Sequence, residues 1–274
     1  MDNALNQVFA DLGMKTNMTL VILTVALLMS RVIPVIVLSP FLGGDLVPNE
    51  IKIGIGVTLA MVLYPAVSDR ITEVPFQTLP FIMLMLKELF IGVCIAFVVN
   101  IVFDAAQIAG GLVDMLSGMN MAQVYVPQLQ QNVTIFASLK FQLSIVVFLS
   151  LNGHHLVIEA LSDSLVSIPL DTYPTWPMGR WAFFDLILRM FGDLLRIGLL
   201  LSAPAFLATF LTDLALGMIN RVAPQVQVFF MSMSIKPLVA AMMVLLTMHV
   251  FLDRLHDQFA AMLRALKEAI RLLA

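Results

Sequence analysis

Charged residues are scarce in this sequence. Asp, Glu, Lys and Arg make up only 12% of its 274 residues, about half the share in an ordinary soluble domain. The net charge is −3, and the charged residues are scattered along the chain. This excludes a basic surface of the kind that binds nucleic acid. Apolar residues make up 60% of the chain and form long runs, so the sequence predicts an integral membrane protein.

Three further absences narrow the chemistry. The single cysteine, Cys94, cannot form an internal disulfide and is expected to fill the core. Strict alternation of apolar and polar residues is absent, which excludes a closed β-barrel and leaves an all-α fold. No phosphate-binding loop is present, and we predict no cofactor. The first apolar run is too long for a cleavable signal peptide, so we expect the first helix to stay as an anchor.

The predicted fold is a polytopic membrane protein of about six long hydrophobic helices with amphipathic helices added. The expected spans cover residues 18–42, 51–67, 76–103, 133–151, 182–216 and 226–251. A more polar helix continues the third span to residue 121, and a short amphipathic helix follows the fourth to about residue 166. Residues 1–17 are predicted to form an interfacial or periplasmic helix.

Residues 253–274 predict an amphipathic helix. Its apolar positions recur every three or four residues, at Leu255, Phe259, Met262, Leu266, Ile270 and Leu273. The same segment carries the densest basic cluster of the chain. Because cytoplasmic segments of membrane proteins are enriched in Lys and Arg, we expect the C terminus to lie in the cytoplasm.

Ten charged residues lie within or beside the apolar runs: Arg31, Lys87, Glu88, Asp104, Arg189, Asp193, Arg196, Asp213, Arg221 and Lys236. Each costs about 2.5–3.5 kcal/mol at a bilayer centre, so they must pair, face water or contact protein. They can serve as contacts between helices, as contacts between subunits, or as a proton relay. Such a number of charges favours a protein that buries its faces against other proteins.

The spacing of these charges predicts some of their partners. Arg189, Asp193 and Arg196 share one helix face and predict an internal ionic ladder. Lys87 and Glu88 are adjacent and point about 100° apart on a helix. We therefore expect them not to pair with each other, and each to find a partner on another helix or chain.

Residues 110–132, GGLVDMLSGMNMAQVYVPQLQQN, interrupt this apolar chain with a small, polar and flexible segment. We predict that the segment is a loop near membrane depth that guards a passage. Met115, Met119 and Met121 suit a deformable seal because methionine is flexible and polarizable. Gly118 and Pro127 are the predicted hinges.

Four stretches resemble the FliR/SctT family, a core subunit of the type III secretion export gate in flagella and injectisomes. They are RVIPVIVLSPFLGGDLVPNEIKIGIGVTLAMVLYP (31–65), KELFIGVCIAFVVNIVFDAAQIAGG (87–111), FLSLNGHHLVIEALSDSLVSIPL (148–170) and SAPAFLATFLTDLALGMINRVAPQVQVFFMSMSIK (202–236). LNGHH followed by LALGMINRVAPQ is the most specific part. The segment from Pro224 to Lys236 looks nearer the injectisome members.

The resemblance implies a subunit built like two smaller gate proteins fused in one chain. Residues 18–170 would be the P/R-like part, and 182–274 a Q/S-like helical hairpin with an amphipathic tail. Such subunits form a helical hetero-oligomeric channel in the bacterial inner membrane, and this type contributes a plug loop. The loop corresponds to Gly118, Met119, Asn120, Met121, Ala122, Gln123, Val124, Tyr125, Val126, Pro127 and Gln128.

The partners implied are the P/R-type (FliP/SctR) and Q/S-type (FliQ/SctS) gate subunits, the FlhB/SctU-type switch protein and the FlhA/SctV-type export protein. Unfolded secretion substrates and membrane lipid are implied as well.

Two other functions stay open on the residues alone. A secondary transporter would use the buried charges as a proton or solute path, although no internal repeat is visible. An intramembrane enzyme would use His154, His155 and Glu159; His155 and Glu159 have the spacing of metal ligands, but no third ligand is placed to join them.

Overall fold

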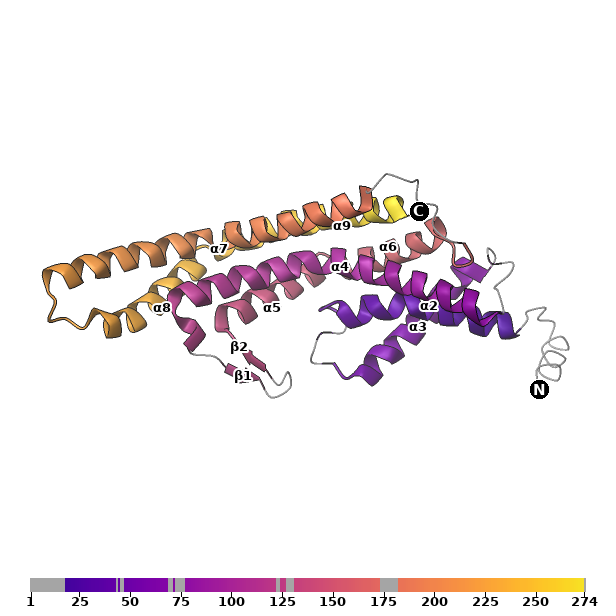
Figure 1. The fold of residues 1–274 in the computed structure, drawn as a ribbon, viewed down its shortest axis with the longest axis horizontal. Helices are drawn as coiled ribbons and strands as arrows, with labels where there is room; N and C mark the ends of the chain where they lie inside the picture. The colour runs from indigo at the N-terminus through magenta and orange to yellow at the C-terminus, as the bar shows by residue number, and fades with distance from the viewer. Residues whose placement is uncertain are drawn as a thin grey trace. The chain divides into compact units, whose positions relative to one another are not determined.

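The structure, a computed structural model, describes residues 18–42, 44, 47–68, 71, 77–121, 124–126, 131–172 and 182–273. Within these ranges the helices are α2 (Met18–Leu38), α3 (Asn49–Ser68), α4 (Thr78–Ser117), α5 (Ile135–Ser150), α6 (Gly153–Ser167), α7 (Ala182–Val222), α8 (Val228–Leu246) and α9 (Met248–Leu273) (Figure 1). A 3-10 turn, η1 (Met119–Met121), and two short strands, β1 (Val124–Val126) and β2 (Gln131–Val133), complete the described elements. The predicted all-α class is confirmed, and the predicted helix at residues 1–17 lies outside the described residues.

The membrane-spanning character of the chain is confirmed. Five helices, α2, α3, α4, α7 and α8, are long and apolar enough to cross a membrane, and a sixth span exists if α5 and α6 form one broken span. The expected spans start within two residues of the observed helices, whereas the ends of α7 and α8 differ from the prediction by six and five residues. The continuation of the third span is also correct, since α4 runs without interruption to Ser117.

The break between α5 and α6 has a local cause. Asn152 has a left-handed backbone, with a φ of 57°, which asparagine tolerates better than most residues. A Cβ on Gly153 would overlap the ring of Phe148, so only glycine fits where α6 begins. The helix expected over residues 133–151 therefore ends where predicted, but α5 has only 16 residues and counts as a span only together with α6.

The described chain falls into two compact units that each draw on distant parts of the sequence. Unit 1 contains Met1–Val99, His155–Asp185 and Arg264–Ala274, and unit 2 contains Asn100–His154 and Leu186–Leu263. Each unit combines residues of the predicted P/R-like part with residues of the Q/S-like part. The division of the chain into those two parts stays a prediction.

Close helix packing in unit 1 depends on small residues. The backbone of α4 at Gly92 lies against the carbonyl group of Arg31 in α2, where a Cβ would overlap the carbonyl oxygen. Gly56 of α3 faces Ile33 and Ile36 of α2. Helices that approach this closely gain dispersion contacts along their backbones, which is the usual basis of helix association in membranes.

Unit 2 has an aromatic core. Phe103 of α4, Phe148 of α5 and Phe259 of α9 are buried, and their ring centroids lie 5.1–5.2 Å apart. Pairs at this separation with tilted planes are favourable beyond the area that they bury. These rings join three helices that are far apart in sequence.

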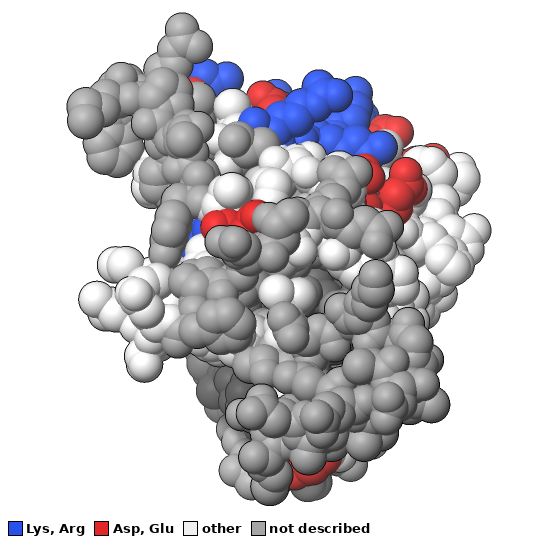
Figure 2. Space-filling view, turned by 90° about the vertical axis from the view of Figure 1, so that its right-hand side faces the viewer, with Lys and Arg blue, Asp and Glu red and all other residues white. Residues whose placement is uncertain are grey.

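The amphipathic character predicted for the last helix is confirmed. All six stripe residues of α9, from Leu255 to Leu273, are buried. The basic residues Arg264, Lys267 and Arg271 lie on the exposed side of α9. In the face of the molecule that Figure 2 shows, Lys and Arg side chains gather in one area. The apolar stripe thus fixes which side of α9 faces outward.

Candidate functional site

The polar segment between α4 and α5 forms a β-hairpin. After α4 ends at Ser117, Gly118 adopts a left-handed φ of 77°, and the chain passes through η1 into β1. Strands β1 and β2 pair antiparallel, with Val124 opposite Val133 and Val126 opposite Gln131. The sequence predicted a loop here and did not predict the strand pairing. Glycine adopts the left-handed backbone of Gly118 without strain, and its role as a hinge stays a prediction.

Only part of the predicted plug is described. Ala122, Gln123, Pro127 and Gln128 lie outside the described residues. For Met121 and for Val124–Val126 the backbone alone is described. The assignment of Gly118–Gln128 as a plug therefore stays a prediction. The contacts at the base of the hairpin are the described features that bear on it.

Asp114, in the last turn of α4, clamps the base of this hairpin. Its side chain is completely buried, and its two carboxylate oxygens accept hydrogen bonds from the backbone N–H groups of Phe136 (3.1 Å) and Ala137 (2.8 Å). These are the second and third residues of α5, whose own N-cap residue, Thr134, makes no side-chain hydrogen bond to the helix. Asp114 thus acts as the N-cap of α5 from a different helix, and its charge suits a helix N-terminus.

Gly110 lets the two helices approach closely enough for this clamp. A Cβ at Gly110 would overlap the carbonyl oxygen of Phe136 and the backbone of Ala137, whereas Gly111 has open space. Gly110 and Asp114 are four residues apart and so lie on one face of α4. Together they hold the two ends of the hairpin segment in a fixed relation.

The three methionines predicted for a seal have different surroundings. Met115 is exposed, and Met119 is half-buried against an apolar cluster that includes Val113 and Phe136. The side chain of Met121 lies outside the described part of the chain. Met119 therefore packs into the base of the hairpin in this chain, while Met115 faces outward.

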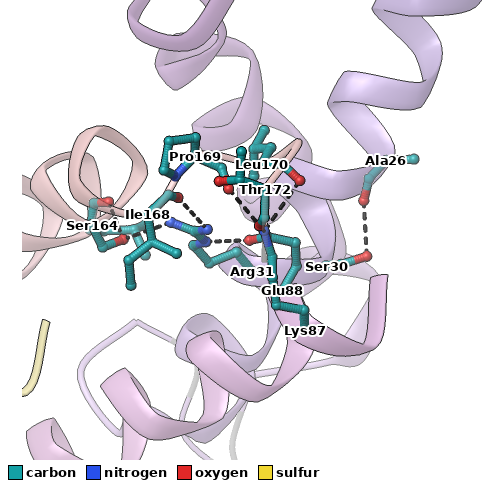
Figure 3. A network of polar contacts seen from close by, with 11 residues as sticks. Ala26, Ser30, Arg31, Lys87, Glu88, Ser164, Ile168, Pro169, Leu170 and Thr172 are labelled. Atoms are coloured by element: carbon teal, nitrogen blue, oxygen red, sulfur yellow. Dashed lines mark hydrogen bonds and ion pairs between the residues drawn. The ribbon is translucent and has the colours of Figure 1, made fainter. Parts of the chain in front are cut away.

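A buried cluster of charges occupies unit 1 (Figure 3). Arg31 of α2 and Glu88 of α4 form an ion pair, and both side chains are completely buried. The Arg31 guanidinium also donates to the hydroxyl of Ser164 in α6 (3.3 Å) and to the carbonyl of Ile168 (2.9 Å). Arg31 thus connects α2, α4 and the end of α6 through charge-assisted hydrogen bonds, which are stronger than neutral ones.

Lys87 corrects one sequence prediction. The expectation that Lys87 and Glu88 would not pair is wrong, since Lys87 Nζ lies 2.7 Å from Glu88 Oε1. Lys87 and Glu88 point about 100° apart on α4, but the four-carbon side chain of lysine is flexible enough to bring its ammonium group to the Glu88 carboxylate. Lys87 Nζ also donates to the carbonyl oxygens of Pro169 (2.9 Å), Leu170 (3.2 Å) and Thr172 (2.8 Å) (Figure 3). The expected partner on another helix exists for Glu88, in Arg31.

The other predicted charges lie at the surface of the single chain. Asp213 and Lys236 join α7 to α8 through an ion pair of 2.5 Å, and both are partly exposed. Five more are exposed: Asp104, Arg189, Asp193, Arg196 and Arg221. The three residues of the predicted ladder, Arg189, Asp193 and Arg196, thus lie at the surface of this chain, and their pairing stays a prediction. Burial of these charges against other subunits stays a prediction.

Sequence reasoning missed three buried charges, Asp114, Lys140 and Lys52. The spacing of Asp114 could have predicted its burial. It lies four residues after Gly110 and eight after Ala106, on a helix face of small residues that favours close packing. Lys140 carried no such signal, because a lysine within an apolar run predicts only that the charge needs a partner. No group of three or more His, Cys, Asp or Glu side chains in the described ranges is arranged to hold a metal ion.

Comparison with known proteins agrees with this architecture. The family model described as bacterial export proteins, family 1, matches residues 22–262. The flagellar biosynthetic protein FliR of Bacillus subtilis is 26% identical over 243 residues, which cover 88% of this chain and 92% of that protein. The Yop proteins translocation protein T of Yersinia pestis is 32% identical over 231 residues, which cover 82% and 85%.

The secretion system apparatus protein SsaT of Salmonella typhimurium is 30% identical over 169 residues, which cover 60% of this chain and 62% of that protein. The relatives thus include both flagellar and injectisome proteins. With its multi-pass helical fold, the chain belongs to family 1 of the bacterial export proteins, the FliR/SctT family, and is an inner-membrane component of the type III secretion export apparatus.

Proposed function

We propose that this chain is a core subunit of the type III secretion export gate. With P/R-type and Q/S-type subunits it forms the channel through which unfolded proteins cross the bacterial inner membrane. FlhB/SctU-type and FlhA/SctV-type proteins are the further partners of this assembly, and energy for export comes from outside this chain.

The surface of α7 and α8 carries this proposal. Exposed charges such as Arg196 and Asp213 lie among exposed apolar side chains such as Leu199, Phe210 and Leu211. Lipid would accept the apolar side chains but not the charges, and water would accept the charges but not the apolar side chains. Burial against other polypeptides satisfies both, which is what a subunit of an assembled channel requires.

The lengths of the helices support the same reading. α4 has 40 residues and α7 has 41, so each is about 60 Å long at 1.5 Å per residue. A hydrocarbon core is about 30 Å thick. Half of each helix must therefore lie outside the hydrocarbon or be tilted strongly, and its apolar residues there need protein partners.

We further propose that the hairpin segment Gly118–Gln128 is the plug of this channel. A plug needs a fixed base, so that it returns to the same place after a substrate has passed, and a tip that can yield. Asp114 and Gly110 supply the fixed base, and the left-handed Gly118 supplies a hinge. Met115, exposed beside the base, suits a soft contact with neighbouring chains.

Copurification tests the assembly. The tagged chain is co-expressed with the P/R-type and Q/S-type subunits. After gentle detergent extraction it should elute in a complex with both. A secondary transporter would instead elute alone or as a homo-oligomer. Recovery of the folded chain without either subunit would refute the gate assignment.

Ion leakage tests the plug. Deletion of residues 118–128 should raise the ion conductance of the inner membrane, because the passage would lose its seal while α4 and α5 remain. A matched control replaces the same residues by a Gly-Ser segment of equal length, which separates loss of sequence from shortening. Unchanged conductance in both variants, with the complex intact, would remove the plug assignment.

We favour the injectisome type over the flagellar type. The segment from Pro224 to Lys236 supports this choice, because it looks nearer the injectisome members. Sequence identity does not separate the two types, since the Yop translocation protein T is 32% identical over 231 residues and the FliR protein of Pectobacterium carotovorum is 30% identical over 200 residues. Complementation decides between them: the chain should restore secretion in an injectisome strain that lacks the corresponding subunit and should fail to restore motility in a flagellar one.

A further inference from the structure

Unit 2 contains a cavity that the channel function does not use. Its volume is about 290 Å³, and residues of α5, α7, α8 and α9 line it. Ile197, Leu200, Leu201, Pro204 and Val244 supply apolar walls. The volume lies just below the range of about 300–1,000 Å³ that is usual for ligand pockets. The cavity thus accommodates one narrow apolar group rather than a whole cofactor.

Two cationic side chains also line this cavity. Lys140 of α5 is buried, with 4% of its surface exposed, although it lies within an apolar helix. Its ammonium group donates to the carbonyl oxygen of Leu201 (3.2 Å) and lies 5.3 Å from the ring centroid of Phe251. Arg254 of α9 is exposed where it borders the cavity.

Lys140 lacks an anionic partner within the described part of the chain. One carbonyl oxygen and one aromatic face leave donor capacity unused, because an ammonium group has three N–H donors. The acidic group that acts on it electrostatically is Asp114. Both oxygens of Asp114 are already engaged by the N–H groups of Phe136 and Ala137. A buried cation with spare donors beside an apolar cavity therefore favours an anionic, amphiphilic ligand.

We propose that this cavity is a binding site for an anionic glycerophospholipid, with one acyl chain against the apolar walls and the headgroup phosphate paired with Lys140 and Arg254. A phosphate offers several acceptor oxygens, so one group can engage both side chains through charge-assisted hydrogen bonds. Two of the helices that line the site, α7 and α8, are long and apolar enough to cross a membrane, and anionic headgroups commonly occupy basic pockets between membrane helices. The site does not depend on the plug.

Lipid retention in the purified complex tests this proposal. The complex is incubated with dioleoylphosphatidylglycerol or dioleoylphosphatidylcholine, and the lipid that remains bound is counted by native mass spectrometry. The complex should prefer phosphatidylglycerol, and Lys140→Met should reduce its retention about tenfold, which corresponds to the loss of one charge-assisted hydrogen bond. Lys267→Met, on the exposed face of α9 and away from the cavity, should retain as much as the unmodified chain.

Two further variants keep the test decisive if Lys140→Met does not assemble. Arg254→Gln changes an exposed side chain and should lower the preference for phosphatidylglycerol over phosphatidylcholine. Leu200→Trp fills the cavity and should release both lipids. Inorganic phosphate at millimolar concentration should displace neither lipid, which separates a lipid site from a phosphate site.

Three results would overturn the proposal. The first is equal retention of the two lipids by the unmodified complex. The second is unchanged phosphatidylglycerol retention in Arg254→Gln and Leu200→Trp. The third is a carboxylate of a neighbouring subunit found paired with Lys140, which would make the cavity a protein interface.

Discussion

Replacement of Asp114 by alanine should loosen the base of the hairpin. The substitution leaves the N–H groups of Phe136 and Ala137 without an acceptor at a buried position. Each buried N–H group that loses its partner costs about 1–3 kcal/mol, so the two together cost about 2–6 kcal/mol. A whole domain has a stability of only about 5–15 kcal/mol. The first turn of α5 should therefore open far more often than before.

Hydrogen exchange measures this opening directly. In the purified complex, peptides that cover residues 134–140 should exchange at least about 30-fold faster in Asp114→Ala, since 2 kcal/mol corresponds to that factor. Asp114→Asn keeps one carbonyl oxygen of the same shape and can still accept from one N–H group. Its effect should be about half as large in free energy.

The control for this series is Asp163→Asn, which changes an exposed carboxylate on α6 and should leave the exchange of residues 134–140 unchanged. Exchange in Asp114→Ala that stays within threefold of the unmodified chain would show that the N–H groups of α5 do not depend on Asp114. Ion leakage is the functional readout: a loosened base should raise conductance less than deletion of residues 118–128 does.

Three other tests concern the buried ion pair, the helix packing and the assembly. Glu88→Leu should cost about 3–5 kcal/mol of stability, because it leaves Arg31 buried without its anion. The double mutant with Arg31→Met should recover part of the thermal stability of the complex. Purely additive effects of the two substitutions would contradict the pairing. Gly92→Ala should lower the stability of the complex by at least about 1–3 kcal/mol, because the added Cβ overlaps the backbone of α2. The control is Gly54→Ala, whose Cβ meets open space and which should leave the melting temperature within about a degree of that of the unmodified complex. Removal of the Asp213 carboxylate by Asp213→Ala should weaken copurification with the other gate subunits, and equal recovery would argue against a role of this charge in assembly.

The helices were predictable because length and hydropathy fix them almost without tertiary information. The apolar runs placed α4 and α7 well, and the spacing by three and four identified the stripe of α9. The helix expected over residues 133–151 also ends where predicted, just before Asn152 and Gly153. In each case the signal lies within one element.

The contacts between elements were much less predictable. Asp114 caps α5 across 22 residues of chain, and single-sequence patterns carry no record of such a pairing. Hydropathy treats Lys140 and Asp104 alike, although packing buries Lys140 and leaves Asp104 exposed. The strands β1 and β2 have three residues each, too few for an alternating pattern to stand out.

The Arg31 cluster also constrains the order in which this protein can fold. Arg31 belongs to the first described helix, but its acceptors arrive much later in synthesis, at Glu88, Ser164 and Ile168. Glu88 becomes available first, and the hydroxyl of Ser164 and the carbonyl of Ile168 complete the set only when residue 168 has left the ribosome. The full set of contacts around Arg31 can therefore form only after α6 has been made.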